Sequence, residues 1–145
     1  MPKSQFSVRI KRIVRQRARG CCEYCLSQER FSTHDFSIEH IIPASKQGSD
    51  SLDNLALSCQ GCNNFKYNKI EATDPVSGIK CPLFHPRNQS WEEHFSWDES
   101  YVQMVGKTPV GRATIEALRL NREKLVNLRR ALFLLKEHPP GDVWH

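Results

Sequence analysis

The pattern of apolar and polar residues predicts short strands in the first half of the chain. Residues 36–42 are rich in β-branched and aromatic side chains and are followed by Pro43, which is typical of a strand that ends there. Residues 52–57 alternate apolar and polar positions, as a second short strand would, and residues 60–69 have the composition of a helix without a breaker. The polar residues 44–51 connect the two strands. The predicted order is strand, loop, strand, helix.

Both ends of the chain show helical periodicity. Ser7 is a suitable cap for a helix that runs to about Arg19 and is ended by Gly20, with its apolar side formed by Ile10, Ile13 and Val14.

A second long helix is predicted from Thr108 to about Glu137, ended by Pro139 and Pro140. Its leucines form one apolar stripe: Leu118, Leu125, Leu128, Leu132 and Leu135. Its arginines are expected on the opposite, solvent-facing side: Arg119, Arg122, Arg129 and Arg130. We expect the stripe to pack on the N-terminal helix. A dimer through this helix is an alternative, although fewer than three regular heptads are present.

Residues 71–107 combine prolines, turn signals and scattered aromatic residues. This composition favours an irregular or short-stranded lobe whose rings form part of the core. Trp91 and Phe95 lie four residues apart and are expected to pack together. A second metal site at His85 or His94 is an alternative role for this lobe.

The composition of the chain is that of a globular protein. The chain has 145 residues, 39% hydrophobic and 26% charged, which is typical of one globular domain with its own core. No apolar run approaches the roughly 18 residues of a membrane span. The basic N-terminus lacks the apolar segment of a signal peptide. We therefore expect a cytoplasmic protein with no membrane partner.

Four of the six cysteines form two C-x₂-C pairs: Cys22 with Cys25, and Cys59 with Cys62. Two such pairs can supply the four thiolates of a tetrahedral structural zinc site. Zinc there would join the end of the N-terminal segment to the predicted helix at residue 60 and would contribute folding energy. Disulfides, which are disfavoured in a cytosolic chain, and buried free thiols are the alternatives. Cys21 and Cys81 are expected to be ordinary core residues.

The stretch 36–69 resembles the HNH endonucleases, whose site is a ββα-metal finger. The resemblance rests on three motifs in order: Glu39-His40-Ile41-Ile42-Pro43, Asp53-Asn54-Leu55, and Cys59-x-x-Cys62-Asn63 followed by Lys66. Residues 74–97 also look like the downstream part of many bacterial members, so the resemblance covers nearly the whole chain. In the family the first His is the general base, the middle Asn braces the loop, and the last Asn or His binds the metal together with the acidic residue before the first His.

The resemblance therefore implies that His40 is the base, that Asn54 braces the loop, and that Glu39 and Asn63 hold the catalytic metal. A neutral imidazole, with a usual pKa of about 6.5, is suited to deprotonating water near neutral pH. Carboxylate and amide oxygens favour Mg²⁺ or Mn²⁺, which stabilises the charge of the phosphorane and the leaving oxygen. Neighbouring strand residues point to opposite faces, so Glu39 and His40 share a site only if the strand twists or ends there.

The formal net charge of +5 is unevenly distributed. Residues 1–20 carry seven basic side chains and no acidic one, which leaves 14 basic and 16 acidic side chains, a net −2, in the rest. Beside a nuclease motif, such residues are candidates for binding DNA phosphates, whereas in an arbitrary protein they would form a solvated helix face. The candidate phosphate contacts are Arg9, Arg12, Arg15, Arg19, Lys66, Lys69 and Arg87.

Together these patterns predict an α+β fold: a ββα-metal finger of two short antiparallel strands and a helix, held together by zinc and flanked by helices. We expect one domain over residues 1–145, with a basic N-terminal helix (1–20), a zinc-containing core (21–70), an aromatic lobe (71–107) and a C-terminal helix (108–137). The expected function is a monomeric, Mg²⁺- or Mn²⁺-dependent DNA endonuclease. The alternative is a zinc-stabilised nucleic-acid-binding module that does not cut.

Overall fold

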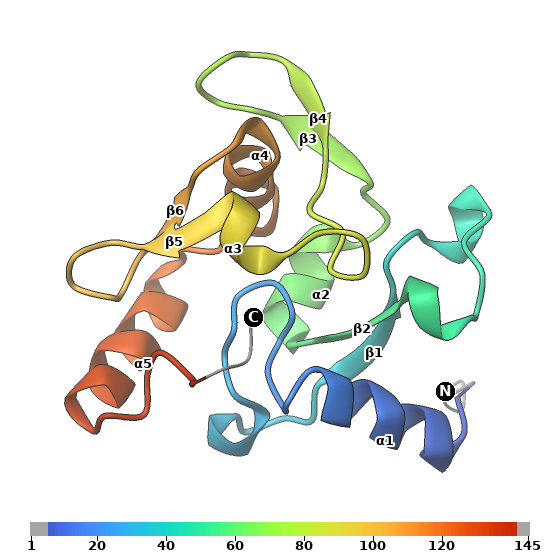
Figure 1. Ribbon diagram of the computed structural model, residues 1–145, viewed down its shortest axis with the longest axis horizontal. Helices are drawn as coiled ribbons and strands as arrows, with labels where there is room; N and C mark the ends of the chain where they lie inside the picture. The colour runs from blue at the N-terminus through green and yellow to red at the C-terminus, as the bar shows by residue number, and fades with distance from the viewer. Residues whose placement is uncertain (1–5, 142–145) are drawn as a thin grey trace.

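Three pairs of antiparallel strands and five α-helices make up residues 6–141, the part of the chain that this computed structural model describes (Figure 1). The α-helices are α1 (Val8–Arg17), α2 (Gln60–Lys66), α3 (Trp91–His94), α4 (Pro109–Leu118) and α5 (Glu123–Leu134). The strand pairs are β1 (Ser37–His40) with β2 (Leu55–Ser58), β3 (Glu71–Thr73) with β4 (Lys80–Pro82), and β5 (Phe95–Trp97) with β6 (Met104–Gly106). The α+β class predicted from the sequence is confirmed.

The ββα unit consists of β1, β2 and α2. In the antiparallel register, Ser37 lies opposite Ser58 and His40 lies opposite Leu55. Helix α1 packs against β2 and α2 packs against β1, so the two strands lie between two helices (Figure 1). All three elements are shorter than predicted. Residues 52–54 form a 3₁₀ turn, so β2 begins only at Leu55. Helix α2 ends at Lys66, because the next residue, Tyr67, has a positive φ of 49°.

The N-terminal helix begins where the sequence predicts. The Ser7 hydroxyl accepts a hydrogen bond of 3.2 Å from the Ile10 N–H and thereby caps α1. The helix ends at Arg17, because Arg19 and Gly20 both take left-handed conformations, with φ of 54° and 72°. Arg19 therefore lies in the turn after the helix. Lys3, one of the seven basic residues of this segment, lies outside the described residues.

The prediction of one long C-terminal helix is wrong. The chain leaves the helical conformation at Arg119, whose φ is 50°, and resumes it at Glu123, which gives two helices, α4 and α5. The Asn121 amide holds this break against β6, since it accepts from the Met104 N–H at 2.7 Å and donates to the Met104 carbonyl at 2.9 Å. The carbonyls of Leu118 and Arg119 at the break accept instead from the Arg122 side chain, both at 3.2 Å.

The predicted partner and faces of this segment also need correction. Helix α4 makes its most extensive contacts with β6, β3, β4 and α2, and its Leu118 shares one core cluster with Val14 of α1. Arg129, expected in solvent, is only 3% exposed and donates to the Leu120 carbonyl at 2.8 Å and the Val102 carbonyl at 3.0 Å. Leu135, expected on the buried stripe, is 69% exposed. Arg129 lies four residues after Leu125 and three before Leu132, so it shares their buried face of α5, whereas Leu135 lies just past the end of that helix.

The aromatic lobe uses its rings as predicted. It consists of two short hairpins, β3–β4 and β5–β6, and the single turn of α3. The rings of Trp91 and Phe95 pack with their centroids 5.3 Å apart, which confirms the expected pair, and Phe84 contacts Phe95 edge-on at 5.2 Å. The first hairpin is fixed to α4 by Arg112, which donates to both carboxylate oxygens of the buried Asp74 at 2.9 and 2.8 Å.

The hydrophobic core draws residues from both ends of the chain. Val14 of α1, Leu57 of β2 and Leu118 of α4 are all fully buried in one cluster. Cys21 and Cys81 are buried, with 2% and 7% exposure, as expected of ordinary core residues. In residues 6–141 no helix has the length and apolar character needed to cross a membrane.

Candidate active site and metal centre

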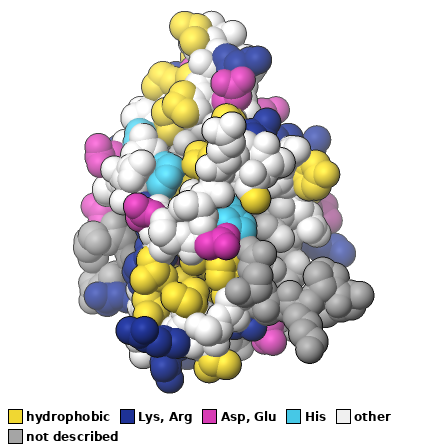
Figure 2. Space-filling model, turned by 90° about the vertical axis from the view of Figure 1, so that its right-hand side faces the viewer, with side chains coloured by type: hydrophobic (Ala, Val, Ile, Leu, Met, Phe, Trp, Pro, Cys, Tyr) yellow, Lys and Arg dark blue, Asp and Glu magenta, His cyan; other side chains and the backbone are white. Residues whose placement is uncertain are grey.

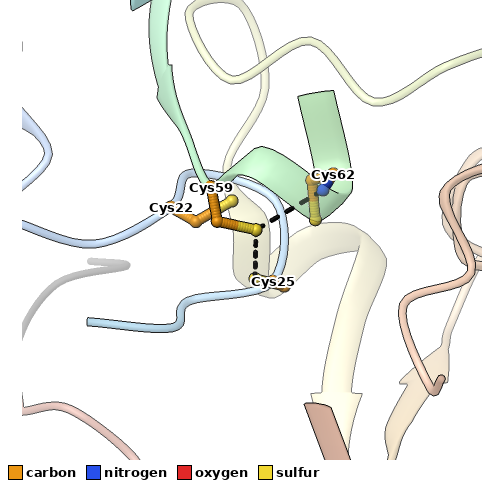
Figure 3. A group of neighbouring side chains, drawn as sticks. All are labelled: Cys22, Cys25, Cys59 and Cys62. Atoms are coloured by element: carbon orange, nitrogen blue, oxygen red, sulfur yellow. Dashed lines mark hydrogen bonds between the residues drawn. The ribbon is translucent and has the colours of Figure 1, made fainter. Parts of the chain in front are cut away.

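The four cysteines of the two C-x₂-C pairs meet at the start of α2 (Figure 3). Cys22 and Cys25 come from the loop after α1, whereas Cys59 caps α2 and Cys62 lies in its first turn. Their Sγ atoms all lie within 4.8 Å of one another, and those of Cys25 and Cys59 are 3.7 Å apart. In a tetrahedral zinc site with Zn–S bonds of about 2.3 Å, the sulfurs are separated by about 3.8 Å. The cluster therefore has the size of a Cys₄ metal site.

Burial and mutual hydrogen bonds shift the pKa values of the clustered thiols in different directions. Burial raises the pKa of the Cys22 thiol well above its usual range. Hydrogen bonds from the thiols of Cys22, Cys25 and Cys62 lower the pKa of Cys59. A divalent cation bound by all four sulfurs would allow them to be deprotonated together in spite of their burial.

His40 is the last residue of β1 and lies beside a carboxylate that the sequence did not single out. Its Nε2 atom is 2.6 Å from Oδ1 of Asp50, in the loop between β1 and β2. The Phe6 ring packs on the imidazole with the centroids 5.6 Å apart. The His40 side chain keeps 17% exposure and that of Asp50 keeps 74%, so the pair lies at the surface. No spacing rule relates a base to an acid ten residues later, and for this reason Asp50 was missed.

The loop that carries Asp50 is held by Asn54. The Asn54 side chain accepts from the Ile42 N–H at 2.9 Å and donates to the carbonyls of Ile42 and Ser49, at 3.0 and 2.8 Å. Gly48 lies so close to the Ile42 carbonyl oxygen that an added Cβ would be 1.6 Å from it. The amide of Asn54 therefore joins both ends of a tightly packed loop that follows His40.

Glu39 lies on the other side of β1, in a buried ion pair. Its Oε2 atom is 3.2 Å from Nζ of Lys66 on α2, and the two side chains are 6% and 2% exposed. Lys66 also donates to the Ile41 carbonyl at 2.8 Å and the His40 carbonyl at 3.4 Å. Burial raises the pKa of Glu39, although the charge of Lys66 opposes this. The pair joins α2 to the end of β1.

This arrangement corrects the sequence-based placement of Lys66. The sequence predicted an exposed lysine beside Lys69 that could hold a DNA phosphate. With 1% exposure and three oxygen partners in residues 39–41, Lys66 is directed into the protein.

Glu39 and Asn63 are the residues predicted to hold the catalytic metal. Oε1 of Glu39 is buried, Oε2 faces Lys66, and the Tyr24 hydroxyl beside the carboxyl opposes the rise in its pKa that burial causes. Asn63 lies one turn before Lys66, and residues three apart share a helix face, so Asn63 is on the side of α2 that faces β1. A carboxylate and an amide oxygen are donor types that suit a hard divalent ion, while Glu39 and His40 are placed on opposite sides of β1 at the point where the strand ends.

Comparison with known proteins agrees with this architecture. Residues 22–69, which contain both cysteine pairs, His40, Asn54 and Asn63, match the family model described as HNH endonuclease. This segment is an HNH domain. The Septu protein PtuA of Bacillus mycoides (strain KBAB4) is 30% identical over 91 residues, which cover 56% of this chain and 13% of that protein. The chain therefore spans only a small part of this relative's length. No solved structure matches the chain.

Basic side chains around the HNH domain differ in their availability. Arg9, Arg12, Arg19 and Lys69 are exposed. Arg15 instead donates to both Glu29 carboxylate oxygens at 2.9 and 3.0 Å, and Arg87 is paired with the largely buried Glu23. On the face that contains the β1–β2 loop, basic side chains lie in separate groups near the margin and do not form a continuous band (Figure 2). Only part of the predicted set is free to contact a polyanion.

The cysteine cluster gives the first prediction. The purified protein should contain one zinc per chain by elemental analysis, because four buried thiolates bind this ion tightly. Cys25→Ser and Cys59→Ser should each give unfolded or aggregated protein. A folded wild-type protein without zinc would refute the assignment.

The Glu39–Lys66 pair gives the second prediction. Lys66→Ala should lower the free energy of unfolding by about 3–5 kcal/mol, because it leaves a buried carboxylate without its partner. Burial raises the pKa of Glu39 and the charge of Lys66 opposes this, so in Lys66→Ala the pKa should rise further, the carboxyl should be more readily protonated at low pH, and the loss should be smaller at pH 5 than at pH 8. Urea unfolding at the two pH values measures this.

Two further results decide the role of Lys66. Glu39→Gln in the Lys66→Ala background should recover part of the stability, because it removes the buried charge. If Lys66→Ala instead unfolds like the wild type and only weakens DNA binding, Lys66 acts as a phosphate contact.

Proposed function

We propose that this protein is a divalent-metal-dependent endonuclease that hydrolyses DNA phosphodiester bonds and carries a structural zinc on Cys22, Cys25, Cys59 and Cys62. The main support is the pairing of His40 with Asp50 at the end of β1, inside an HNH domain. An imidazole held by a carboxylate, at the surface and beside a braced loop, is suited to take a proton from water.

In the proposed mechanism His40 is the general base. Because the Asp50 carboxylate accepts the Nε2–H, we assign the neutral imidazole its lone pair on Nδ1. Nδ1 takes a proton from a water molecule whose oxygen attacks the phosphorus, and Asp50 stabilises the imidazolium that forms. Phe6 and the loop held by Asn54 restrict the orientation of the ring.

Glu39 and Asn63 would hold the catalytic Mg²⁺ or Mn²⁺ between β1 and α2. When bound, this cation stabilises the negative charge of the phosphorane and of the leaving oxygen. Glu39 is already engaged by Lys66, so ion binding competes with an ammonium group. We therefore expect weak, exchangeable binding, unlike that of the zinc.

The DNA backbone would be contacted by the exposed basic residues Arg9, Arg12, Arg19 and Lys69. Contacts to phosphates add affinity that depends on salt and carry no sequence information. We propose that the protein acts as a monomer in the cytoplasm, a reducing compartment that suits its six unpaired cysteines.

One observation favours a second candidate function. The ion pair between Glu39 and Lys66 uses the carboxylate that the catalytic metal needs. If it persists with divalent ions present, the protein is a zinc-stabilised nucleic-acid-binding module that does not cut. Incubation with supercoiled plasmid and Mg²⁺, Mn²⁺ or EDTA separates the two, because an endonuclease yields nicked and linear DNA only with the metals.

The third prediction concerns the base. His40→Ala should reduce cleavage by at least 10²-fold, the usual contribution of a general base, while zinc content and DNA binding stay unchanged. Plasmid cleavage, elemental analysis and a gel-shift titration provide the three measurements. Cleavage near the wild-type rate would remove His40 from the mechanism.

The fourth prediction concerns Asp50. Asp50→Asn should lower kcat about 10-fold at saturating DNA, a fraction of what the base itself contributes, because the imidazolium loses its negative partner. DNA affinity should not fall, since Asp50 contributes a negative charge. Asp35→Asn removes the same charge from an exposed position before β1 and should cleave normally. Equal rates for the two variants would mean that Asp50 does not assist His40.

A further inference from the structure

Arg122, the residue before α5, lies against the cysteine cluster. Its Nη2 atom is 3.5 Å from the Cys59 sulfur, and its Nη1 and Nη2 atoms are each 3.7 Å from the Cys62 sulfur. These distances are within the range of N–H donation to sulfur. A side chain from the C-terminal helices thus contacts two of the four predicted zinc ligands, both from α2.

Gly61 provides the space for this contact. It lies between Cys59 and Cys62, and a Cβ at this position would be 2.4 Å from Nη2 and 2.9 Å from Cζ of Arg122. Any larger residue would displace the guanidinium from the sulfurs.

The net charge of a zinc–thiolate site explains why a cation should lie beside it. Zinc with four thiolates carries a net charge of −2, and such a charge is costly in a buried site unless a cation lies beside it. Arg122 is the basic side chain whose nitrogens contact these sulfurs within residues 6–141. The guanidinium is planar and always protonated, so it can bond two sulfurs at once without losing its charge.

Of the two sulfurs that Arg122 contacts, that of Cys59 belongs to the more exposed residue. Cys59 is 8% exposed, whereas Cys22, Cys25 and Cys62 are 0–1% exposed. A hollow of about 340 Å³, lined by Cys59, Gln60, Gly61, Arg122 and Leu125 among others, lies beside it. Reagents that attack thiolates would approach Cys59 from this side, where Nη2 of Arg122 lies.

We propose that Arg122 is a positioning residue of the zinc site that neutralises and shields the thiolates of Cys59 and Cys62 and thereby joins the C-terminal helices to the HNH domain. The inference rests on zinc in the Cys₄ cluster and does not depend on nuclease activity. The competing explanation is that Arg122 only closes the α4–α5 turn, since its Nη1 also donates to the carbonyls of Leu118 and Arg119, both at 3.2 Å.

The fifth prediction compares zinc release from variants of the whole protein. N-ethylmaleimide alkylates thiolates, and a chromogenic chelator reports the zinc that is released. Arg122→Gln should release zinc about 10-fold faster than the wild type, within the 10–100-fold that partners of metal ligands usually contribute. Arg119→Gln is the matched control, because it removes the same charge from the same turn at an exposed position without sulfur contact, and it should behave like the wild type.

Gly61→Ala tests the contact with Arg122 still present. Alanine favours a helix more than glycine does, so urea unfolding should show no loss of α2 stability, yet zinc release should again be faster because the guanidinium is displaced. If Arg122→Gln does not fold, Gly61→Ala still tests whether Arg122 shields the zinc ligands.

Three results would overturn the proposal. These are wild-type release rates in both Arg122→Gln and Gly61→Ala, equal acceleration in Arg119→Gln, or faster release only in variants that unfold more readily. Absence of zinc from the wild type would instead remove the zinc assignment, and elemental analysis detects that before any variant is made.

Discussion

Convergence of four thiols at the start of α2 is the constraint on which the rest of the structure depends. Two of them come from the loop after α1 and two from α2, so their meeting fixes the N-terminal segment relative to the helix that carries Asn63. The β1–β2 pair then lies between α1 and α2. A small ββα unit has few apolar residues of its own, and metal ligation is an efficient way to hold it. The leucines of the C-terminal helices complete the same core.

The local elements of the HNH domain could be predicted from the sequence because their signals are local. A capping Ser7, an apolar strand stopped by Pro43 and two C-x₂-C pairs each depend on a few neighbouring residues. The C-terminal region was predicted less well, since the leucine repeat continues unchanged through the break at Arg119. That break is fixed by Asn121 bonding to Met104, a tertiary contact that no periodicity records.

Some residues of the candidate site could likewise be predicted from the sequence, and others could not. The spacing of His40, Asn54 and Asn63 is visible in the sequence, and the loop bonds of Asn54 agree with the bracing expected of it. Asp50, Lys66 and Arg122 could not be assigned, because each acts through a partner distant in the chain. The sequence suggested a solvent-facing side chain for both basic residues, yet Lys66 lies against the buried Glu39 carboxylate and Arg122 against two cysteine sulfurs. Charge alone does not predict where a basic side chain is directed.

Arg122 and Lys66 each place a positive charge at one end of α2. Arg122 faces the sulfurs at the start of the helix, and Lys66 faces Glu39 at its last residue. The sulfur site can keep its cation when zinc is present, because the net charge remains negative. At Glu39 the situation differs, since a divalent ion and an ammonium group would compete for one carboxylate. In the proposed enzyme, activation by Mg²⁺ therefore includes the cost of loosening Lys66 from Glu39, while its bonds to the carbonyls of His40 and Ile41 can remain. The base would keep its position while the metal exchanges.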